Sequence, residues 1–353
     1  MKTNGMEGAR GDRACGARPR MVRGRMDRGR GGRACVTRAW RARTWGARTR
    51  GTLVGLLAGM AITAAPGAAQ ETIEETRPLR AGGSLEIRTM DHSILLIPWD
   101  RNEVRVRGEY DPRLERLEIR GSGDSGESLT VEIHHEGGSR GRESRGDRTL
   151  EVQVPAELRL DGGSVSGSIE GAGLRGTVEV ASVSGSIRLT GLDVERAHIT
   201  SVSGSLQVEG RGEEVRARTV SGEVRVNVEA PVIAAQSVSG PVTVEGRGVH
   251  RRVEMGAVSG GIVFQGALGP RGELKAESHS GNVELTFNRN VDARFRLSTF
   301  SGSIRADLEG VRDRREERGR FAPGETLTFT TGDGLGRVEA RSFSGRLRVG
   351  HGG

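Results

Sequence analysis

The stretch Val178–Leu189, with the sequence VEVASVSGSIRL, contains the unit that decides the fold. Its Ser-Gly pair recurs along the chain, with the serine at Ser166, Ser184, Ser203, Ser221, Ser239, Ser259, Ser280, Ser301 and Ser344. The successive spacings are 18, 19, 18, 18, 20, 21, 21 and 43 residues. A nearly constant period of about 20 residues is typical of a solenoid, in which one supersecondary unit stacks on copies of itself.

The apolar residues of this unit alternate as they do in short strands. Val178 and Val180 share one face, and Val183, Ile187 and Leu189 share a parity after a one-residue shift. A change of parity within an apolar pattern indicates a corner between two short strands. We therefore expect all five side chains to point into the core, with two strands and two bends in each repeat.

The Ser-Gly pair itself is predicted to form the bend. Gly185 has no Cβ, so it fits where the chain turns sharply or a neighbouring backbone comes close. Ser184 and Ser186 flank it, and stacked copies of these serines are expected to form hydrogen-bonded ladders along the solenoid axis.

The composition favours a narrow stacked core. Aromatic residues make up 3% of the chain, and the apolar supply is mainly Val, Ile, Leu and Ala. The fold class predicted is all-β, a single parallel β-solenoid with about 18–21 residues per coil. An antiparallel sandwich or propeller-like array is the alternative, but it needs hairpin turns such as Asn-Gly or Asp-Gly. Such turns are scarce, with Asp161-Gly162 as an exception.

The N-terminal segment has the features of a secretory signal. Residues 1–50 contain Lys2 and fourteen arginines against three acidic residues, which gives this segment a net charge of +12. The whole chain has a net charge of +8, so the remainder is acidic. An uncharged apolar run, Gly51–Ala65, and small residues at 66–69 follow. This order predicts a secretory signal peptide within residues 1–69 and a periplasmic, cell-surface or extracellular location. No later apolar run reaches bilayer length, so we expect no integral membrane segment after cleavage.

The rest of the chain divides into two parts of one predicted solenoid. Residues 70–160 are expected to form N-terminal coils with two polar loops, at 121–128 and 137–147, and residues 161–353 to form the regular Ser-Gly coils. The last spacing of 43 residues contains Arg312–Arg320, RDRREERGR. We expect this run to be a solvated loop on a coil that lost its Ser-Gly pair.

The sequence gives no pattern typical of a catalytic, cofactor or metal site. His134 and His135 are adjacent, so in a strand they point to opposite faces. The other histidines are scattered and are expected at the surface: His92, His198, His250, His279 and His351. Cys15 and Cys35 precede the predicted cleavage, so neither a disulfide nor thiolate chemistry is expected. Catalytic, cofactor-binding and metal-binding residues are therefore predicted to be none.

The glutamates decide between a binding role and an enzymatic one. Polysaccharide-cleaving β-helices gather carboxylates in one groove. Here the glutamates are spread over many coils, usually beside an arginine, as at Glu170, Glu179, Glu209, Glu223, Glu229, Glu245, Glu254 and Glu284. Such alternation indicates cross-strand charge pairing. Nucleic-acid binding is disfavoured, because the chain from Gln70 onward has a net charge of −4 and few aromatic platforms.

Several short motifs resemble the bacterial putative-adhesin family of β-strand repeats. They are Leu79–Leu85 (LRAGGSL), Ile97–Asp100 (IPWD), Val104–Val106 (VRV), Val154-Pro155 and the serial SVSGSI units. The resemblance covers roughly residues 75–350. It implies an exported domain of β-strand repeats whose function is unknown.

The function expected is a structural or adhesive one. Repeated Ser, Arg and Glu side chains offer many weak contacts, which add through effective concentration. We therefore predict a non-enzymatic, multivalent binding protein of the cell surface or envelope, whose ligand is a glycan or a protein. The alternatives are a carbohydrate-processing β-helix enzyme and a scaffold that stacks end to end, and the oligomeric state stays open. Arg346 and Arg348, on the last strand, argue against unrestricted stacking.

Overall fold

The computed structural model describes residues 71–112, 115–135, 148–318 and 324–352. The predicted signal peptide at 1–69 and the predicted loop at 137–147 lie outside these residues. Within them the chain contains β-strands and a three-residue 3-10 turn, η1 (Gly123–Ser125), in the exposed loop predicted at 121–128. The described residues include no helix long and apolar enough to cross a membrane.

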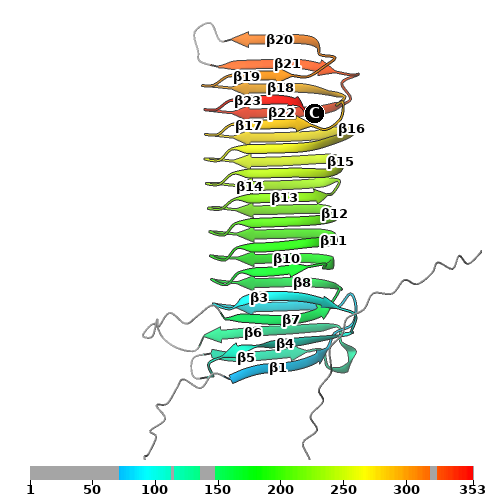
Figure 1. The fold of residues 1–353 in the computed structure, drawn as a ribbon, viewed down its shortest axis with the longest axis vertical. Coiled ribbons are helices and arrows are strands. Elements are labelled where there is room, and N and C mark those ends of the chain that lie inside the picture. Colours follow the sequence, from blue (N-terminus) through cyan, green and yellow to red (C-terminus); the bar gives the residue numbers. More distant parts are fainter. Residues whose placement is uncertain (1–70, 113–114, 136–147, 319–323, 353) are drawn as a thin grey trace, which may run out of the picture. The chain divides into compact units, whose positions relative to one another are not determined.

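The strands form two ladders joined at corners, as Figure 1 shows. The first ladder contains β8 (Glu157–Ser164), β10 (Arg175–Ser182), β14 (Val232–Ser237) and the C-terminal halves of four long strands, which are β11 (Ile187–Ser201), β12 (Leu206–Thr219), β15 (Val242–Ala257) and β16 (Ile262–Ser278). The second contains β9 (Ile169–Ala172), β13 (Val224–Glu229), β17 (Val283–Phe287) and the N-terminal halves of the long strands. All these pairings are parallel and couple each coil to the next. The predicted β-solenoid is confirmed.

Alternating side chains fill the space between the two ladders. Val178 and Val180 on β10 and Ile187 and Leu189 on β11 are at most 1% exposed. Val183 was expected among them, but it is 45% exposed. That expectation is wrong because the parity changes later, at the Ser-Gly pair, so the residue just before the pair points outward.

The corner depends on contacts between backbones of adjacent coils. A Cβ on Gly185 would lie 1.9 Å from the Gly167 carbonyl oxygen, so only glycine fits. The Gly185 N–H donates to Ser182 Oγ at 2.8 Å, and the Ser201 hydroxyl donates to the Gly185 carbonyl at 3.4 Å. The structural hydroxyl is therefore the buried Ser or Thr three residues before the glycine, which every corner has except that of Gly260, where Ala257 takes its place. The sequence predicted hydrogen-bonded ladders of the serines that flank the corner glycines. Among these serines, the Ser205 hydroxyl donates to the Ser186 hydroxyl at 3.1 Å.

The N-terminal layers do not follow the order of the sequence. Here β2 (Ser84–Thr89) pairs in parallel with both β8 and β6 (Ser128–His135), and β3 (Ser93–Trp99) pairs with both β9 and β7 (Thr149–Pro155). The chain therefore forms the coil of β2 and β3 first, then the layers on one side of that coil, and finally β8 and β9 on its other side. Three antiparallel strands complete this end, β1 (Glu71–Pro78), β4 (Glu103–Tyr110) and β5 (Glu115–Gly121).

The C-terminal layers are also out of order. The last coil, β22 (Gly336–Ser342) and β23 (Leu347–His351), lies between the coil ending in β17 and the coil of β18 (Ala293–Thr299) and β19 (Ile304–Asp307). Figure 1 shows this red coil between yellow and orange strands. Two antiparallel strands, β21 (Glu325–Thr331) and β20 (Arg312–Arg318), follow β18.

Two expectations about the C-terminal part are therefore wrong. The run at 312–318 is an edge strand rather than a loop. No coil has lost its Ser-Gly pair there, because Gly345 lies between Gly281 and Gly302 in the glycine column. The spacing of 43 residues reflects a coil inserted out of sequence order.

Candidate functional site

One corner of the solenoid carries a strip of apolar and hydroxyl side chains along most of its length. In each layer an exposed apolar or aromatic residue is followed by an exposed polar one, usually serine. We call this the Val–Ser strip, and its first column, in layer order, is Met90, Val165, Val183, Val202, Val220, Val238, Val258, His279, Phe343 and Phe300. Backbone hydrogen bonds fix that order; for example, Ser184 N–H donates to the Val165 carbonyl at 2.8 Å.

The apolar residues of the strip are held outward. The six valines are 41–46% exposed, and Phe300 and Phe343 are 45% and 47% exposed. At one end His279, Phe343 and Phe300 stack face to face, with centroid distances of 4.8 and 4.7 Å. The second column is serine in every layer from Ser166 to Ser301, and Asp91 replaces it beside Met90. Sequence reasoning counted the valine as core, although its fixed place before six of the nine Ser-Gly pairs distinguished it from the alternating core residues.

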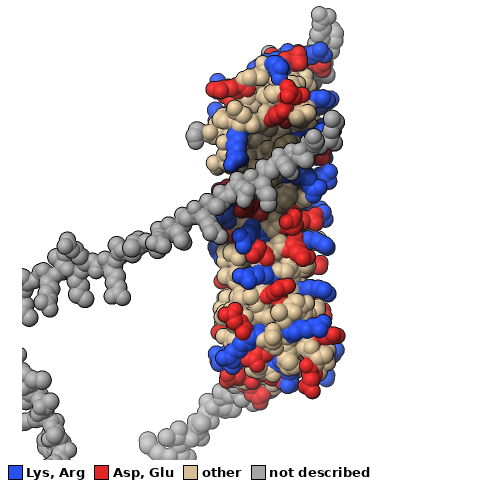
Figure 2. Space-filling model, turned by 90° about the vertical axis from the view of Figure 1, so that its right-hand side faces the viewer, with Lys and Arg blue, Asp and Glu red and all other residues tan. Residues whose placement is uncertain are grey.

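The opposite corner carries alternating charges. Glu157, Arg175, Asp193, Arg211 and Glu229 occupy one register position on successive coils, 18 residues apart. These five residues line a groove with a volume of about 620 Å³. All of them except Glu157 also line a second, shallow groove beside it, together with Arg247. Figure 2 shows basic and acidic side chains interspersed along the stack rather than gathered in a patch of one sign.

Ion pairing within this groove keeps one of its carboxylates, Asp193, ionised. Arg211 donates from Nε and Nη2 to the two carboxylate oxygens of Asp193, both at 2.9 Å. This hydrogen bonding, with the charges of Arg211 and Arg175, lowers the pKa of Asp193 and holds it ionised. A general acid needs a raised pKa, so this carboxylate is poorly suited to the general-acid role in glycoside cleavage.

The eight glutamates considered in the sequence are not brought together. They are spread over successive coils along the stack, and two of them have arginine partners. Glu223 pairs with Arg225 at 2.5 Å, and Glu284 lies 4.0 Å from Arg348. Such pairs on a solvated face contribute little to stability, at most about 1 kcal/mol each.

Two histidines that were expected at the surface are completely buried. His250 packs edge-on against Phe264, with its Nδ1 2.7 Å from the Ala230 carbonyl. Gly246 provides the space, since a Cβ there would lie 1.8 Å from His250 Nε2. His92 lies near the N-terminal end of the regular coils. The expectation that these two residues are at the surface is wrong, because spacing alone gave no sign of burial.

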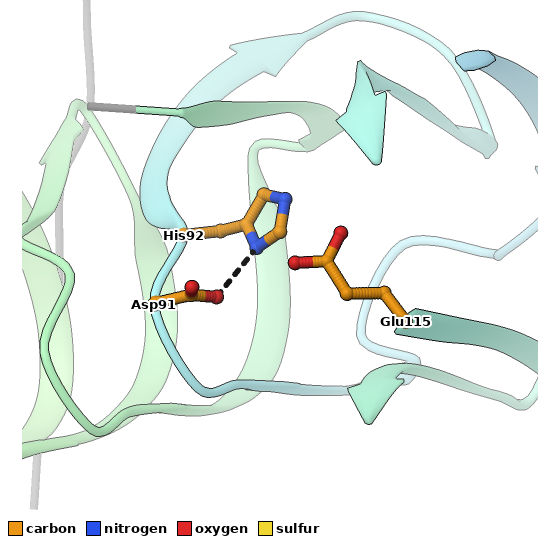
Figure 3. Close-up of side chains that lie close together, drawn as sticks. All are labelled: Asp91, His92 and Glu115. Atoms are coloured by element: carbon orange, nitrogen blue, oxygen red, sulfur yellow. Dashed lines mark ion pairs between the residues drawn. The ribbon is translucent and has the colours of Figure 1, made fainter. Parts of the chain in front are cut away.

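His92 belongs to a small cluster of charged groups. Figure 3 shows its ring beside Asp91, the neighbouring residue, and Glu115 at the start of β5. His92 Nδ1 lies 3.4 Å from Asp91 Oδ1. Arg148 donates to both Glu115 oxygens at 2.6 and 2.7 Å, and its Nη2 lies 3.3 Å from Asp91 Oδ2. Imidazole, two carboxylates and a guanidinium thus meet where the regular coils end.

The geometry defines a parallel β-solenoid with a repeated polar and apolar surface. The chain belongs to the Toastrack DUF4097 family, which matches residues 83–265. The family resemblance expected from the sequence is confirmed. A comparison with curated proteins gave no match.

Solved structures resemble this chain in fold at low sequence identity. One is described as a putative adhesin from Parabacteroides merdae (TM-score 0.44, 8% identity, covering 80% of this chain and 97% of that one). Another is described as a putative adhesin from Bacteroides fragilis (0.43, 9%, 80% and 98%). A third is described as a putative lipid binding protein from Parabacteroides distasonis (0.39, 13%, 79% and 97%).

Proposed function

We propose that this protein is an exported, non-catalytic binding protein of the cell surface or envelope. It holds an extended ligand, a glycan or a protein, by many weak contacts along the Val–Ser strip. The observation that carries the proposal is the strip itself, in a chain in which 28% of residues are charged. An exposed apolar surface bordered by polar groups is typical of an interaction site.

The strip suits a repetitive ligand for three physical reasons. Its side chains carry no charge from Val165 to Val258, so little desolvation energy opposes contact. Each layer offers one apolar surface and one hydroxyl, repeated at about 4.8 Å. The backbone beneath is fixed by hydrogen bonds between coils, so binding orders few groups. Contacts that are weak singly therefore add through effective concentration.

The two alternative functions have less support. An enzyme has less support because the groove carboxylate with a shifted pKa, Asp193, is held ionised by Arg211, whereas a general acid must be protonated. For an end-to-end scaffold, the outermost strands β1 and β20 carry the charged sequences ETIEETRP and RDRREER. Charged edge strands oppose pairing with another chain.

Graded substitution of the strip tests the proposal. The valines at 183, 202, 220 and 238 are changed to aspartate one, two, three and four at a time, and binding to immobilised peptidoglycan, chitin, cellulose and bacterial cells is measured. We expect a stepwise loss of retention on the probe that binds wild type. Val263→Asp is the matched control, because Val263 is 41% exposed on β16, away from the strip, and should bind as wild type does.

Three outcomes would contradict the proposal. Retention unaffected by four aspartates would remove the strip from binding altogether. Cleavage of a glycan probe that is abolished by the single change Asp193→Asn would favour the enzyme instead. Particle mass that rises with wild-type concentration would favour the scaffold.

A further inference from the structure

The cluster around His92 interrupts the Ser-Gly column at a defined place. A Cβ on Gly167 would lie 2.0 Å from the His92 carbonyl oxygen, so His92 occupies the next glycine position of the column. Asp91-His92 thus replaces Ser-Gly, and Met90 occupies the valine position. The strands of the neighbouring layer on the far side, β6 and β7, carry no Ser-Gly pair. The fold permits a histidine here and nowhere inside the regular column.

The two nitrogens of His92 have different surroundings. Nε2 lies 3.0 Å from the Glu109 carbonyl, which can only accept, so Nε2 carries a hydrogen. In the neutral imidazole Nδ1 is then an acceptor with a free lone pair. Nδ1 is buried without a hydrogen-bond partner among the described residues, and it faces the Asp91 carboxylate, also an acceptor. A buried lone pair directed at a carboxylate calls for a cation between them.

Among the described residues, the carboxylates of Asp91 and Glu115 keep unused acceptor positions on the side that faces His92. Glu115 accepts from Arg148 at both oxygens and from the Asp111 backbone N–H at Oε2. A carboxylate has about four acceptor positions, so one remains on Oε1. Asp91 contacts Arg148 through Oδ2, which leaves Oδ1 directed at His92. Among the residues that the structure describes, one guanidinium faces these two carboxylates, which leaves one negative charge uncompensated.

We propose that Asp91, His92 and Glu115 form a zinc-binding site. One ligand atom from each of the three residues lies within 4.8 Å of the others. An imidazole nitrogen with two carboxylates suits zinc better than calcium or magnesium, which prefer all-oxygen ligands. The Asp91 side chain is 46% exposed, so it provides an entry path and room for a water as fourth ligand. Arg148 and the Glu109 carbonyl orient the ligands from outside.

The bound ion would join elements that are distant in sequence. Asp91 and His92 lie between β2 and β3, whereas Glu115 begins β5 in the antiparallel end. Zinc would therefore tie the N-terminal end to the first regular corner, and stabilise the folded state in proportion to its occupancy.

Zinc titration of the full chain tests this site. The chain is prepared without a polyhistidine tag and with Cys15→Ser and Cys35→Ser, so that neither a tag nor a thiolate binds the metal. After chelator treatment, calorimetry with zinc chloride should give one ion per chain, and the melting temperature should rise. Asp91→Ala and His92→Gln should each weaken binding by at least roughly 10–100-fold and remove the rise.

The second carboxylate–histidine group provides the matched control. Glu118, Glu132 and His134 also lie close together, but His134 Nε2 already has Glu132 as a partner at 3.0 Å. His134→Gln should bind zinc as its parent does. Absence of zinc binding by the parent chain would overturn the proposal, as would binding that survives His92→Gln or is lost in His134→Gln. The exposed Asp91 keeps the test decisive if His92→Gln fails to fold.

Discussion

The regular middle of the solenoid and its two ends differ in strand order and in strand direction. From β8 to β17 each coil lies beside its sequence neighbours, all pairings are parallel, and glycine backbones meet at one corner. At the ends the layers are out of sequence order and antiparallel strands are added. Repetition therefore builds the stack, but terminating it requires a departure from the repeat.

The outermost strands show what termination needs. An unpaired strand edge is a template for another chain, and charge blocks such pairing. Among the described residues β20 pairs only with β21, and β1 only with β4. Both outer strands are rich in Arg and Glu. Arg346 and Arg348 do not serve this role as expected from the sequence, because β23 lies inside the stack.

The largest expected effect comes from removing the inserted C-terminal coil. Ending the chain at Leu335 deletes β22 and β23 and with them Val338, Ala340, Leu347 and Val349, all completely buried. It also breaks the pairing of β16 and β17 with the coil beyond. We expect a loss of more than about 5 kcal/mol in unfolding free energy, measured by urea denaturation followed by circular dichroism.

A larger internal deletion should be tolerated better. Joining Asp292 to Gly336 removes residues 293–335, and these two residues already touch through a backbone hydrogen bond of 2.9 Å. Ser280 and Ser344 are 64 positions apart, and losing 43 residues leaves 21, which is a spacing the chain already uses. This variant should fold cooperatively and be more stable than the shorter truncation. The reverse order would refute the inserted-coil interpretation.

Adjacent glycines test the corner itself. In Gly260→Ala the Cβ would lie 2.0 Å from the Gly240 carbonyl oxygen, whereas in Gly261→Ala it would lie 3.6 Å from the nearest atom. The first change forces two coils apart and should cost about 4 kcal/mol or more. The second should be neutral or stabilise by up to about 1 kcal/mol, because alanine restricts the unfolded chain. Equal thermal shifts for the two variants would show that the column does not hold the coils.

The regular coils were predictable from the sequence because their period is a backbone property. A glycine equivalent to Gly185 recurs at each corner where the backbones of adjacent coils are in contact. The alternation that includes Val178 and Val180 identifies the side chains that point into the core. Each signal is local, and neighbours in sequence are neighbours in space. The solenoid, its parallel ladders and its residues per coil could therefore be predicted without coordinates.

The parts that were missed depend on contacts between residues far apart in sequence. The burial of His92 follows from strands β4 and β5, which no spacing relates to it. The position of β23 follows from pairing with β17 and β19, and a gap of 43 residues fits either a lost or an inserted coil. Val183 was misplaced because the parity shift at a corner can fall at any of several residues.

Edge charge should control association with a smaller effect. Arg314 and Glu316 form an ion pair on β20, with 2.9 Å between nitrogen and oxygen. Changing both to valine removes two of the charges on this edge and adds apolar side chains, so we expect molar mass to rise with concentration in light scattering. Changing the equivalent pair, Glu214 and Arg216 on β12, should leave a monodisperse species, because that strand is paired on both sides. Identical behaviour of both double variants would contradict the role given to charge at the ends.

The smallest effect concerns the alternating charges of the middle coils. Arg211 lowers the pKa of Asp193 mainly by hydrogen bonding. A lowered carboxyl pKa contributes stability above its ordinary value, and this contribution is lost as the pH falls through the lowered pKa. Arg211→Gln should therefore raise the pKa of Asp193 toward its ordinary value, as measured by NMR titration of the side-chain carboxyl. The stability of wild type and variant should converge at low pH. A pKa unchanged by this substitution would mean that the pair in the groove is not formed in solution.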